Sequence, residues 1–565
     1  MSQDWFEEHH ATLEGALHAC ETRECWSPYP EVPSGKIYGE TAREDGLAAW
    51  KDRLGRPFPT DQSGTIDWVD TESSPYGIET GVSYPRADLD VLLPAVQDAM
   101  SENWRHTPIE FRTGVCLEIL HRLNRRSFEL AFAVMHTTGQ GFMMAFQAGG
   151  PHAQDRGLEA VAWAYREMTR CPVSATWTKR VSKTETVTLE KTWRIVPRGV
   201  AVTIGCSTFP TWNAYPGIFA SLMTGNGVVI KPHPGAVLPL AITVEIAQGV
   251  LEEAGVDPNL ICLACDSADE PAAQNLVVRD EVGIIDYTGG SEFGTWIESH
   301  AGNRPVYTEK AGVNSIILDS CEDLRDTTGN IAFSLCLYSG QMCTTPQNIY
   351  IPSDGIDTAK GHLSFDEVSG AIVKAVDWFV SDPGRAAEVL GAVQSEATAD
   401  RICTAASEGG AVLRASEPID NERFPNARTA TPLILQVEQG DLNLYAREVF
   451  GPVVYIVKVE DTRSAIEQAC MIARSKGALT AAVWSRNPDV LEHAVDELTA
   501  AGVATSCNLS GQIWVNQSAA FSDFHVSGMN PAGNATLCDG AFVSDRFRFV
   551  ASRIPVLAPV DEAVT

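Results

Sequence analysis

The sequence predicts an α/β protein built from two doubly wound parallel sheets, with a β-hairpin projecting from the body. The first observation is that short buried strands alternate with helical stretches between residues 199 and 306. The second is another alternating series that begins at residue 314. The third is a change of period to two between residues 174 and 198, where polar residues alternate with β-branched or aromatic ones, as in an exposed hairpin.

The N-terminal third is predicted to be an extension followed by helices. Residues 1–85 contain several Pro and Gly together with frequent Trp, Tyr and Phe, which indicates an irregular but ordered segment packed on a domain. From residue 87 to 139 the apolar residues recur at helical spacing, and EAVAWAYREM (159–168) continues this pattern.

Each α/β unit contains strands that are apolar on both faces, as expected in a buried parallel sheet. In the first unit the expected strands lie in GVAVTIGC (199–206), GVVIKP (227–232), LICLAC (260–265) and VGIIDYTGG (282–290). In the second unit they lie in NSIILD (314–319), QNIYIP (347–352), TAAVWSRN (480–487) and QIWVN (512–516).

Composition excludes several classes of function. The chain has 42 Lys and Arg against 73 Asp and Glu, a formal charge of −31, which repels nucleic acid and anionic membranes. Neither a signal peptide nor about 18 consecutive apolar residues is found. Fourteen cysteines without framework spacing indicate reduced thiols. We therefore expect a cytoplasmic protein without nucleic-acid or membrane partners.

Two polar residues follow consecutive strands of the first unit. Asn213 lies in the loop FPTWN, where its amide can donate to a developing oxyanion, and Lys231 closes the next strand, where it can hold ribose or phosphate oxygens. Ligands of α/β sheets bind where the carboxyl ends of strands meet the following loops. Taken alone, a loop asparagine is more often a turn stabiliser.

A glycine-rich turn follows the strand that ends at Tyr287. Gly289, Gly290 and Gly294 open an expected helix, and small residues let backbone N–H groups approach a pyrophosphate. The spacing is not G-x-G-x-x-G, so a simple tight turn remains the alternative.

Cys343 in SGQMC and Glu309 in VYTEKAG are 343 − 309 = 34 residues apart. A thiolate nucleophile and a carboxylate that activates water form a coherent unit for covalent catalysis followed by hydrolysis. Glu448 and Phe450 lie on a Gly-Pro loop in REVFGPVVYIV, ahead of another strand.

Taken in the order in which they occur along the chain, these motifs resemble those of the aldehyde dehydrogenase superfamily. The matching elements are FPTWN, the GN-VV-KP segment, the TG-S-E-G turn, the glutamate loop, G-Q-x-C, E-x-F-G-P and IWVN, which together span roughly residues 199–516.

The resemblance implies roles for individual residues. Cys343 would be the nucleophile, Glu309 the general base, and Asn213 the side-chain half of an oxyanion hole completed by the backbone N–H of Cys343. The implied NAD(P)-binding residues are Lys231 and Glu448 at the riboses, Phe450 at the nicotinamide, Gly289 and Gly294 in the phosphate turn, and Trp212 beside Asn213. No metal is implied.

The resemblance also implies an aldehyde dehydrogenase-like fold with two Rossmann-type α/β domains and a β-hairpin oligomerisation element. The expected divisions are a cofactor-binding domain (1–173, with its N-terminal extension, and 199–306), a catalytic domain (307–516) and oligomerisation strands (174–198 and 540–557). An exposed hairpin needs a cover, so a homodimer or homotetramer is expected.

The N-terminal half narrows the resemblance. ECWSPYPEVPSGKIYGETA (24–42) and VMHTTGQGFMMAFQAGGPHAQDRGLEA (134–160) look like the PaaN family of phenylacetic acid degradation proteins, the stand-alone ring-cleavage aldehyde dehydrogenases. This implies a CoA-linked semialdehyde substrate and a separate hydratase partner. On so acidic a chain, Arg156 and Lys179 are candidates for a basic mouth that receives CoA.

Three positions depart from the family pattern. The loop after Glu309 reads K-A-G-V instead of L-G-G-K, and Gly290 replaces a usual serine. After Lys231 no carboxylate follows, and His233 stands nearby. Because a carboxylate at that place binds the free 2′-hydroxyl of NAD, its absence favours NADP over NAD.

Three other functions stay open as alternatives. Coenzyme A instead of water could accept the acyl group, although Glu309 favours hydrolysis. A catalytically decayed binding protein conflicts with the presence of Cys343, Asn213 and Glu309. A cysteine hydrolase lacks a histidine in any motif near Cys343 and leaves the Lys231 segment unexplained.

Overall fold

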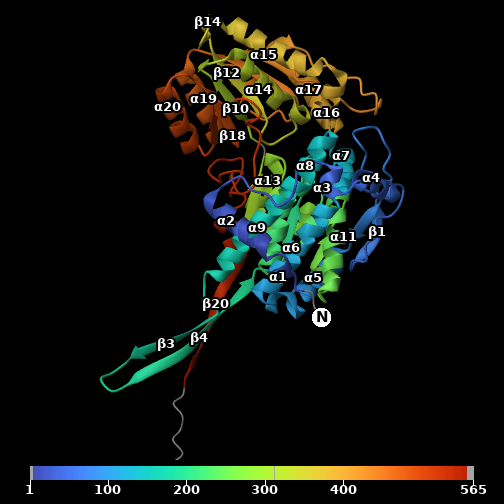
Figure 1. The fold of residues 1–565 in the computed structure, drawn as a ribbon, viewed down its shortest axis with the longest axis vertical. Helices are drawn as coiled ribbons and strands as arrows, with labels where there is room; N and C mark the ends of the chain where they lie inside the picture. Colours follow the sequence, from blue (N-terminus) through green and yellow to red (C-terminus); the bar gives the residue numbers. More distant parts are fainter. Residues whose placement is uncertain (1–3, 311, 557–565) are drawn as a thin grey trace, which may run out of the picture.

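The computed structural model describes residues 4–310 and 312–556, so Ala311 of the altered glutamate loop and residue 557 of the predicted C-terminal strand lie outside it. Figure 1 shows two lobes, one formed mainly by the N-terminal half and the other by the C-terminal half, with a long β-ribbon projecting from the first. Both lobes contain a largely parallel sheet with helices, so the predicted α/β class is confirmed.

The first lobe contains a five-stranded parallel sheet in the order β7-β6-β5-β8-β9. Both neighbours of β5 follow it in sequence, so the order reverses at β5, and ligands bind at the carboxyl ends of strands at such a point. The strands are β5 (Val200–Ile204), β6 (Gly227–Lys231), β7 (Ile261–Leu263), β8 (Val282–Thr288) and β9 (Val306–Glu309).

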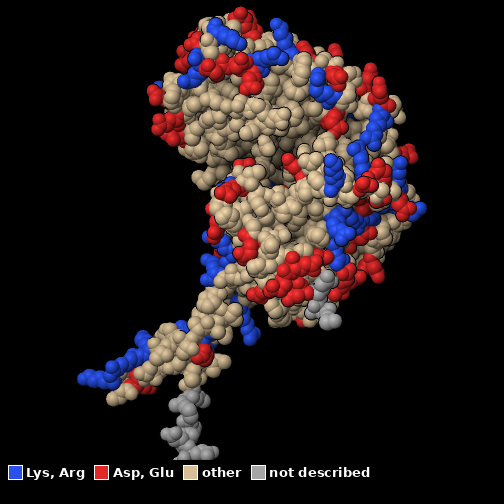
Figure 2. Space-filling view, viewed as in Figure 1, with Lys and Arg blue, Asp and Glu red and all other residues tan. Residues whose placement is uncertain are grey.

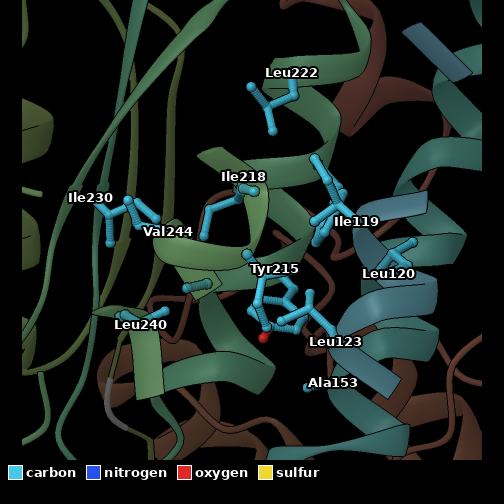
Figure 3. Packing of buried hydrophobic residues seen from close by; sticks show 14 of the residues in the cluster. Ile119, Leu120, Leu123, Ala153, Tyr215, Ile218, Leu222, Ile230, Leu240 and Val244 are labelled. Atoms are coloured by element: carbon cyan, nitrogen blue, oxygen red, sulfur yellow. The ribbon is translucent and has the colours of Figure 1, made fainter. Parts of the chain in front are cut away.

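Helix α10 (Pro210–Met223) is the central helix of this lobe and is buried almost all round. Figure 3 shows Tyr215, Ile218 and Leu222 of α10 among side chains of neighbouring helices and β6. A helix that is apolar on every face needs such a surrounding. The other helices of the lobe are α5 (Leu89–Glu102), α6 (Ile109–Arg125), α7 (Ser127–Thr138), α8 (Phe142–Gly149), α9 (Pro151–Thr169), α11 (Leu238–Glu253), α12 (Ala273–Val278), α13 (Ser291–His300) and α21 (Gly540–Ser544).

The prediction of an irregular N-terminal extension was wrong in part, because residues 5–53 are largely helical. Leu13, Ala16 and Cys20 form the buried face of α2 and pack into the main core of the first lobe. Their spacing is helical, but the Pro- and Gly-rich stretch that follows obscured it. The elements are α1 (Trp5–Glu8), α2 (His10–Thr22), α3 (Gly35–Tyr38), α4 (Ala42–Arg53), β1 (Thr65–Val69) and β2 (Tyr84–Ala87).

The second lobe is built on a seven-stranded sheet, parallel except for its edge strand β15. The strand order is β15 (Ala411–Arg414), β16 (Leu433–Glu438), β17 (Val453–Val459), β12 (Pro346–Pro352), β10 (Asn314–Leu318), β18 (Thr480–Trp484) and β19 (Ala504–Cys507). Its helices are α14 (Leu324–Cys336), α15 (Phe365–Val380), α16 (Pro383–Leu390), α17 (Glu396–Glu408), α18 (Leu442–Tyr445), α19 (Thr462–Lys476) and α20 (Pro488–Ala500).

The strand predicted in QIWVN was wrong, because residues 512–516 form a loop after β19. Their apolar side chains are used in packing without strand pairing: Val515 is buried, and the Trp514 ring stacks on Phe333 of α14 with centroids 4.0 Å apart. A short apolar run does not reveal whether its backbone pairs with a strand.

The projecting ribbon is a three-stranded antiparallel sheet of β3 (Ser174–Arg180), β4 (Thr186–Pro197) and β20 (Phe547–Pro555), with β4 in the middle. The predicted C-terminal segment 540–557 thus begins with helix α21 and becomes a strand only at residue 547. Figure 2 shows Lys and Arg gathered at the outer end of the hairpin. The domain divisions and the oligomerisation role stay predictions.

No helix within residues 4–310 and 312–556 has the length and apolarity needed to cross a membrane. All fourteen cysteines belong to this described part of the chain and are free thiols.

A buried ion pair fixes the root of β20 to the five-stranded sheet. The Arg546 guanidinium donates to both carboxylate oxygens of Asp286 on β8, at 2.8 and 2.6 Å, and to Ser221 at 2.8 Å. Arg546 is fully buried between the Tyr307 and Phe542 rings. Burial lowers the pKa of Arg546, but the Asp286 carboxylate outweighs it and raises the pKa above its usual value.

We expect Asp286→Ala to lower the free energy of unfolding by about 3–5 kcal/mol, because it leaves a buried guanidinium without a counter-charge. The measurement is the midpoint of thermal unfolding. Glu467→Ala is the control, since its partner Arg463 is exposed and such pairs contribute little. Equal midpoints for the two variants would contradict the role given to Asp286.

Candidate active site

The segment that carries Cys343 leaves α14 through a sharp turn. Tyr338, Ser339 and Gly340 have φ values of 52°, 48° and 65°, three left-handed residues in succession. At Gly340 a side chain is also excluded by space, because a Cβ atom would lie 2.7 Å from the Gly451 carbonyl oxygen. The glycine of the Gly-Gln pair is therefore required by backbone conformation and by close packing.

Gln341 holds this turn in place from inside the protein. Its fully buried amide donates to the carbonyls of Tyr338 (3.1 Å) and Ala392 (3.0 Å) and accepts from the N–H of Gln394 (2.8 Å). The Asn314 amide donates to the Cys343 carbonyl at 2.7 Å. The segment that carries Cys343 is thus fixed by hydrogen bonds on both sides of the sulfur.

Cys343 lies against Glu309 at the end of β9 and against His525. The sulfur, a Glu309 carboxylate oxygen and a His525 ring nitrogen all lie within 4.8 Å of one another, and Sγ is 3.7 Å from His525 Nε2. Burial raises the pKa of the Cys343 thiol well above its usual range, and the Glu309 carboxylate raises it further.

Glu309 accepts a hydrogen bond at each carboxylate oxygen. His525 Nε2 lies 2.8 Å from Oε1, and the Asn213 amide donates to Oε2 at 2.6 Å. Burial raises the pKa of Glu309, but the His525 ring, the Cys343 thiol and the Asn213 amide together lower it below its usual value. The buried carboxylate is consequently ionised at neutral pH.

Although the loop after Glu309 is altered, the Glu309 carboxylate lies close to Cys343. Lys310, the first changed residue, turns to Glu298 of α13, with Nζ and the carboxylate 2.9 Å apart. Its backbone N–H donates to the Ala532 carbonyl at 2.6 Å, which extends the end of β9 against the C-terminal segment. The structure thereby brings together Cys343, Glu309 and Asn213, as predicted.

His525 was missed by the sequence analysis, which found no histidine partner for Cys343. The residue is separated from Glu309 by 216 positions and belongs to no motif that the sequence displays. It reaches the site because the segment after β19 folds back, where His525 and Leu537 exchange two backbone hydrogen bonds of 2.8 Å. A histidine in a loop gives no sequence signal for such a contact.

Trp212, predicted to bind the cofactor, packs beside the cluster of Cys343, Glu309 and His525, and its cofactor role stays a prediction. Its ring meets the His525 ring edge-on with centroids 4.7 Å apart, and the Arg156 guanidinium lies 5.0 Å above it. Arg156 is fully buried and paired with Glu159 at 2.8 Å, so it cannot line a CoA entrance at the surface. Lys179 is exposed, but on the projecting hairpin.

Carboxylate, thiol and imidazole groups can also serve as metal ligands. Here both Glu309 oxygens are occupied by hydrogen bonds from His525 and Asn213. We therefore interpret the cluster as a hydrogen-bonded network, and the absence of a metal stays a prediction.

The predicted cofactor residues follow the carboxyl ends of β6 and β8. Lys231 closes β6, and its Nζ lies 2.7 Å from a carboxylate oxygen of Asp266, a residue the sequence analysis missed. Gly289 and Gly290 follow β8 and precede α13, a helix whose N-terminus is capped by no described side chain and could face an anion. Gly294 lies in the first turn of α13.

These residues fit a dinucleotide. A Cβ added at Gly290 would meet open space, so this turn leaves room where a usual serine would project. Burial raises the pKa of the Glu448 carboxylate to about 7. This carboxylate accepts a long hydrogen bond, 3.4 Å, from the Gly312 N–H. Ribose hydroxyls are the kind of donor that such a carboxylate lacks. Phe450 is partly exposed beside it.

His233 does not supply the positive charge expected for a 2′-phosphate. Burial lowers the pKa of this imidazole to about 4, and the Lys231 ammonium contributes to the shift. The ring is therefore neutral at pH 7. The sequence-based preference for NADP rested on the missing carboxylate after Lys231 and on the presence of His233. Burial leaves His233 uncharged, and Asp266 supplies a carboxylate beside Lys231.

Comparisons with known proteins agree with this geometry. The family model described as "Aldehyde dehydrogenase family" matches residues 68–537. N-succinylglutamate 5-semialdehyde dehydrogenase of Burkholderia cenocepacia is 27% identical over 418 residues, covering 73% of this chain and 80% of that protein. 1-Pyrroline-5-carboxylate dehydrogenase 1 of Halalkalibacterium halodurans is 24% identical over 507 residues, covering 86% and 92%.

Solved structures extend the likeness over the whole chain. The crystal structure of an NAD-dependent aldehyde dehydrogenase from Burkholderia multivorans superposes with a TM-score of 0.97 at 51% identity, covering 99% of this chain and 100% of that one. A 1-pyrroline-5-carboxylate dehydrogenase from Thermus with bound NAD gives 0.73 at 21% identity, covering 94% and 99%, and shares the fold. The predicted aldehyde dehydrogenase-like fold is confirmed, and the chain belongs to the aldehyde dehydrogenase family.

Proposed function

We propose that this protein oxidises an aldehyde to a carboxylic acid with NAD, through a thiohemiacetal and then a thioester on Cys343. The observation that carries the proposal is the buried contact of Cys343, Glu309 and Asn213 beside a group of residues that fit a dinucleotide. A nucleophile, a base and an oxyanion donor are the parts that this chemistry requires.

In the first step the Cys343 thiolate attacks the aldehyde carbon. The resulting oxyanion needs donors, and the Asn213 amide is the side-chain donor at this place. In the present arrangement that amide donates to Glu309, so the carboxylate must release it before the oxyanion can take its place. Glu309 and the oxyanion thus use the same donor in turn.

Lys231, Glu448 and the turn at Gly289 would hold NAD, which when bound accepts the hydride that leaves the thiohemiacetal. Glu309 then removes a proton from the water that attacks the thioester. The carboxylate is ionised and close to the sulfur, as this role requires. Cys343 leaves as thiolate, and the acid is released.

NAD fits the cofactor site better than NADP. The Asp266 carboxylate forms an ion pair with Lys231, the residue proposed to hold a ribose, and the buried His233 carries no charge at neutral pH. A carboxylate favours a free 2′-hydroxyl and repels a 2′-phosphate. The NAD-dependent relative from Burkholderia multivorans, 51% identical, supports the same choice.

The resemblance of the N-terminal half to PaaN proteins supports a CoA-linked semialdehyde from an opened aromatic ring as substrate, with a separate hydratase that supplies it. The ribbon of β3, β4 and β20 supports a homo-oligomer, because its two outer strands expose unpaired backbone groups and a second copy would cover them.

We expect Cys343→Ala to abolish NADH formation from aldehydes, a loss on the order of 10⁴-fold or more, because no thiohemiacetal can form. The measurement is absorbance of the reduced nicotinamide with a panel of aldehydes that includes a CoA-thioester semialdehyde. Cys336→Ala, a buried cysteine at the end of α14, is the control. Undiminished NADH formation by Cys343→Ala would end the proposal, and a panel preference for simple aldehydes would refute only the CoA-linked substrate.

We expect Glu309→Gln to keep a first-turnover burst of NADH while steady-state turnover falls roughly 10²-fold or more, since the thioester forms but water is not activated. Rapid mixing measures the burst, and mass spectrometry detects the acyl group on Cys343. Normal acid release by the variant would show that Glu309 is not the base. Restored turnover on adding coenzyme A would favour acyl transfer to CoA.

We expect kcat/KM to favour NAD over NADP by at least about tenfold, equivalent to about 1.4 kcal/mol. Asp266→Asn should narrow this ratio, because it removes a negative charge and leaves the Lys231 ammonium free for a phosphate. Asp269→Asn, an exposed residue three positions later, serves as the control. An enzyme that prefers NADP, or a ratio that does not respond to Asp266→Asn, would contradict the assignment.

A further inference from the structure

We propose that His525 is the hydrogen-bond donor to the catalytic thiolate, serving Glu309 in the resting site and Cys343 when the thiolate forms. The inference rests on the proposed function, which makes Cys343 the nucleophile. It adds a residue that lies outside every motif recognised in the sequence.

The geometry places one ring nitrogen between two acidic groups. His525 Nε2 is 2.8 Å from Glu309 Oε1 and 3.7 Å from Cys343 Sγ. Because Glu309 is ionised, the short contact requires a proton on Nε2, and the same N–H group also faces the sulfur.

The surroundings of the sulfur otherwise oppose a thiolate. The titratable groups that face it are Glu309 at the end of β9 and Cys206 after β5, and Glu448 adds a further negative charge. Arg156 lies behind the Trp212 ring and is neutralised by Glu159. Lys310 pairs with Glu298. The side-chain group that can donate to the sulfur is therefore the His525 ring nitrogen in contact with it.

The proposed step conserves atoms and charge. The S–H bond of Cys343 breaks, its electron pair stays on sulfur, and the proton passes to solvent water. Glu309 stays ionised, and His525 Nε2–H donates to the thiolate at the position where it lies 3.7 Å from the sulfur. The site gains one negative charge on sulfur, and the proton carries the matching positive charge into the solvent.

The fold holds His525 in this position with several contacts. Its backbone forms an antiparallel bridge with Leu537. Its ring packs against Trp212 and is nearly fully buried. Val526 has φ 61°, a conformation that a β-branched residue rarely adopts. Strained backbone of this kind persists where the surrounding structure fixes it, so the segment next to His525 is held in one conformation.

The test measures the thiolate without turnover. The rate of alkylation of Cys343 by iodoacetamide is followed between pH 5 and 10 in the full-length cofactor-free protein, with the modified peptide identified by mass spectrometry. We expect His525→Gln to slow alkylation at pH 7 at least tenfold and to move the profile to higher pH, since only the thiolate reacts. His493→Gln on the exposed face of α20 should behave as wild type.

Two further variants separate electrostatics from loss of structure. We expect Glu309→Gln to speed alkylation at pH 7, because it removes a negative charge beside the sulfur, which is the opposite sign to His525→Gln. For His525→Ala we expect added imidazole to restore at least part of the rate. A structural role would slow both variants, and imidazole would not restore either rate.

An unchanged alkylation profile in His525→Gln would overturn the inference, and so would slowing in both His525→Gln and Glu309→Gln without rescue by imidazole. Either result leaves the proposed function intact as long as Cys343→Ala is inactive. An active Cys343→Ala protein would remove the function first and this inference with it.

Discussion

The pairing between the end of β9 and the C-terminal segment is the contact on which the rest of the site depends. Thr308 N–H donates to the Asn534 side chain at 2.8 Å, and Lys310 N–H donates to the Ala532 carbonyl at 2.6 Å. These bonds pair the end of β9 with the C-terminal segment. They fix the position of the Glu309 carboxylate and bring His525 next to it. The first lobe therefore contributes Glu309, the second lobe contributes Cys343, and the C-terminal segment connects them.

Electrostatics explains why such a connection is needed. A chain with a formal charge of −31 places a thiol against an ionised carboxylate, and this carboxylate makes ionisation of the thiol more costly. Hydrogen bonds from Asn213 and His525 compensate at Glu309. In the proposed chemistry, Asn213 donates to the oxyanion and His525 donates to the sulfur. Both donors therefore already lie beside the reacting groups in the resting site.

The cofactor side follows from sheet topology. In a parallel sheet all carboxyl ends meet at one edge, so the end of β6, the turn after β8 and the end of β9 are neighbours although they are far apart in sequence. Figure 2 shows the molecule hollowed between the two lobes. Lys231 with Asp266 and the turn before α13 thereby form one face of the site, and Cys343 with Glu309 forms the adjoining one.

Much of this was determined by the sequence alone. Strands apolar on both faces predicted the two parallel sheets, and the G-Q-x-C turn and the glutamate loop identified the groups that the structure brings together, because backbone requirements such as the left-handed Gly340 leave a local signal. Only the tertiary structure decided the helical N-terminal segment, the loop conformation of QIWVN, and the positions of Trp212, Asp266 and His525. These depend on contacts between distant segments, and a residue such as His525, 216 positions from Glu309, has no local pattern that reveals its partner.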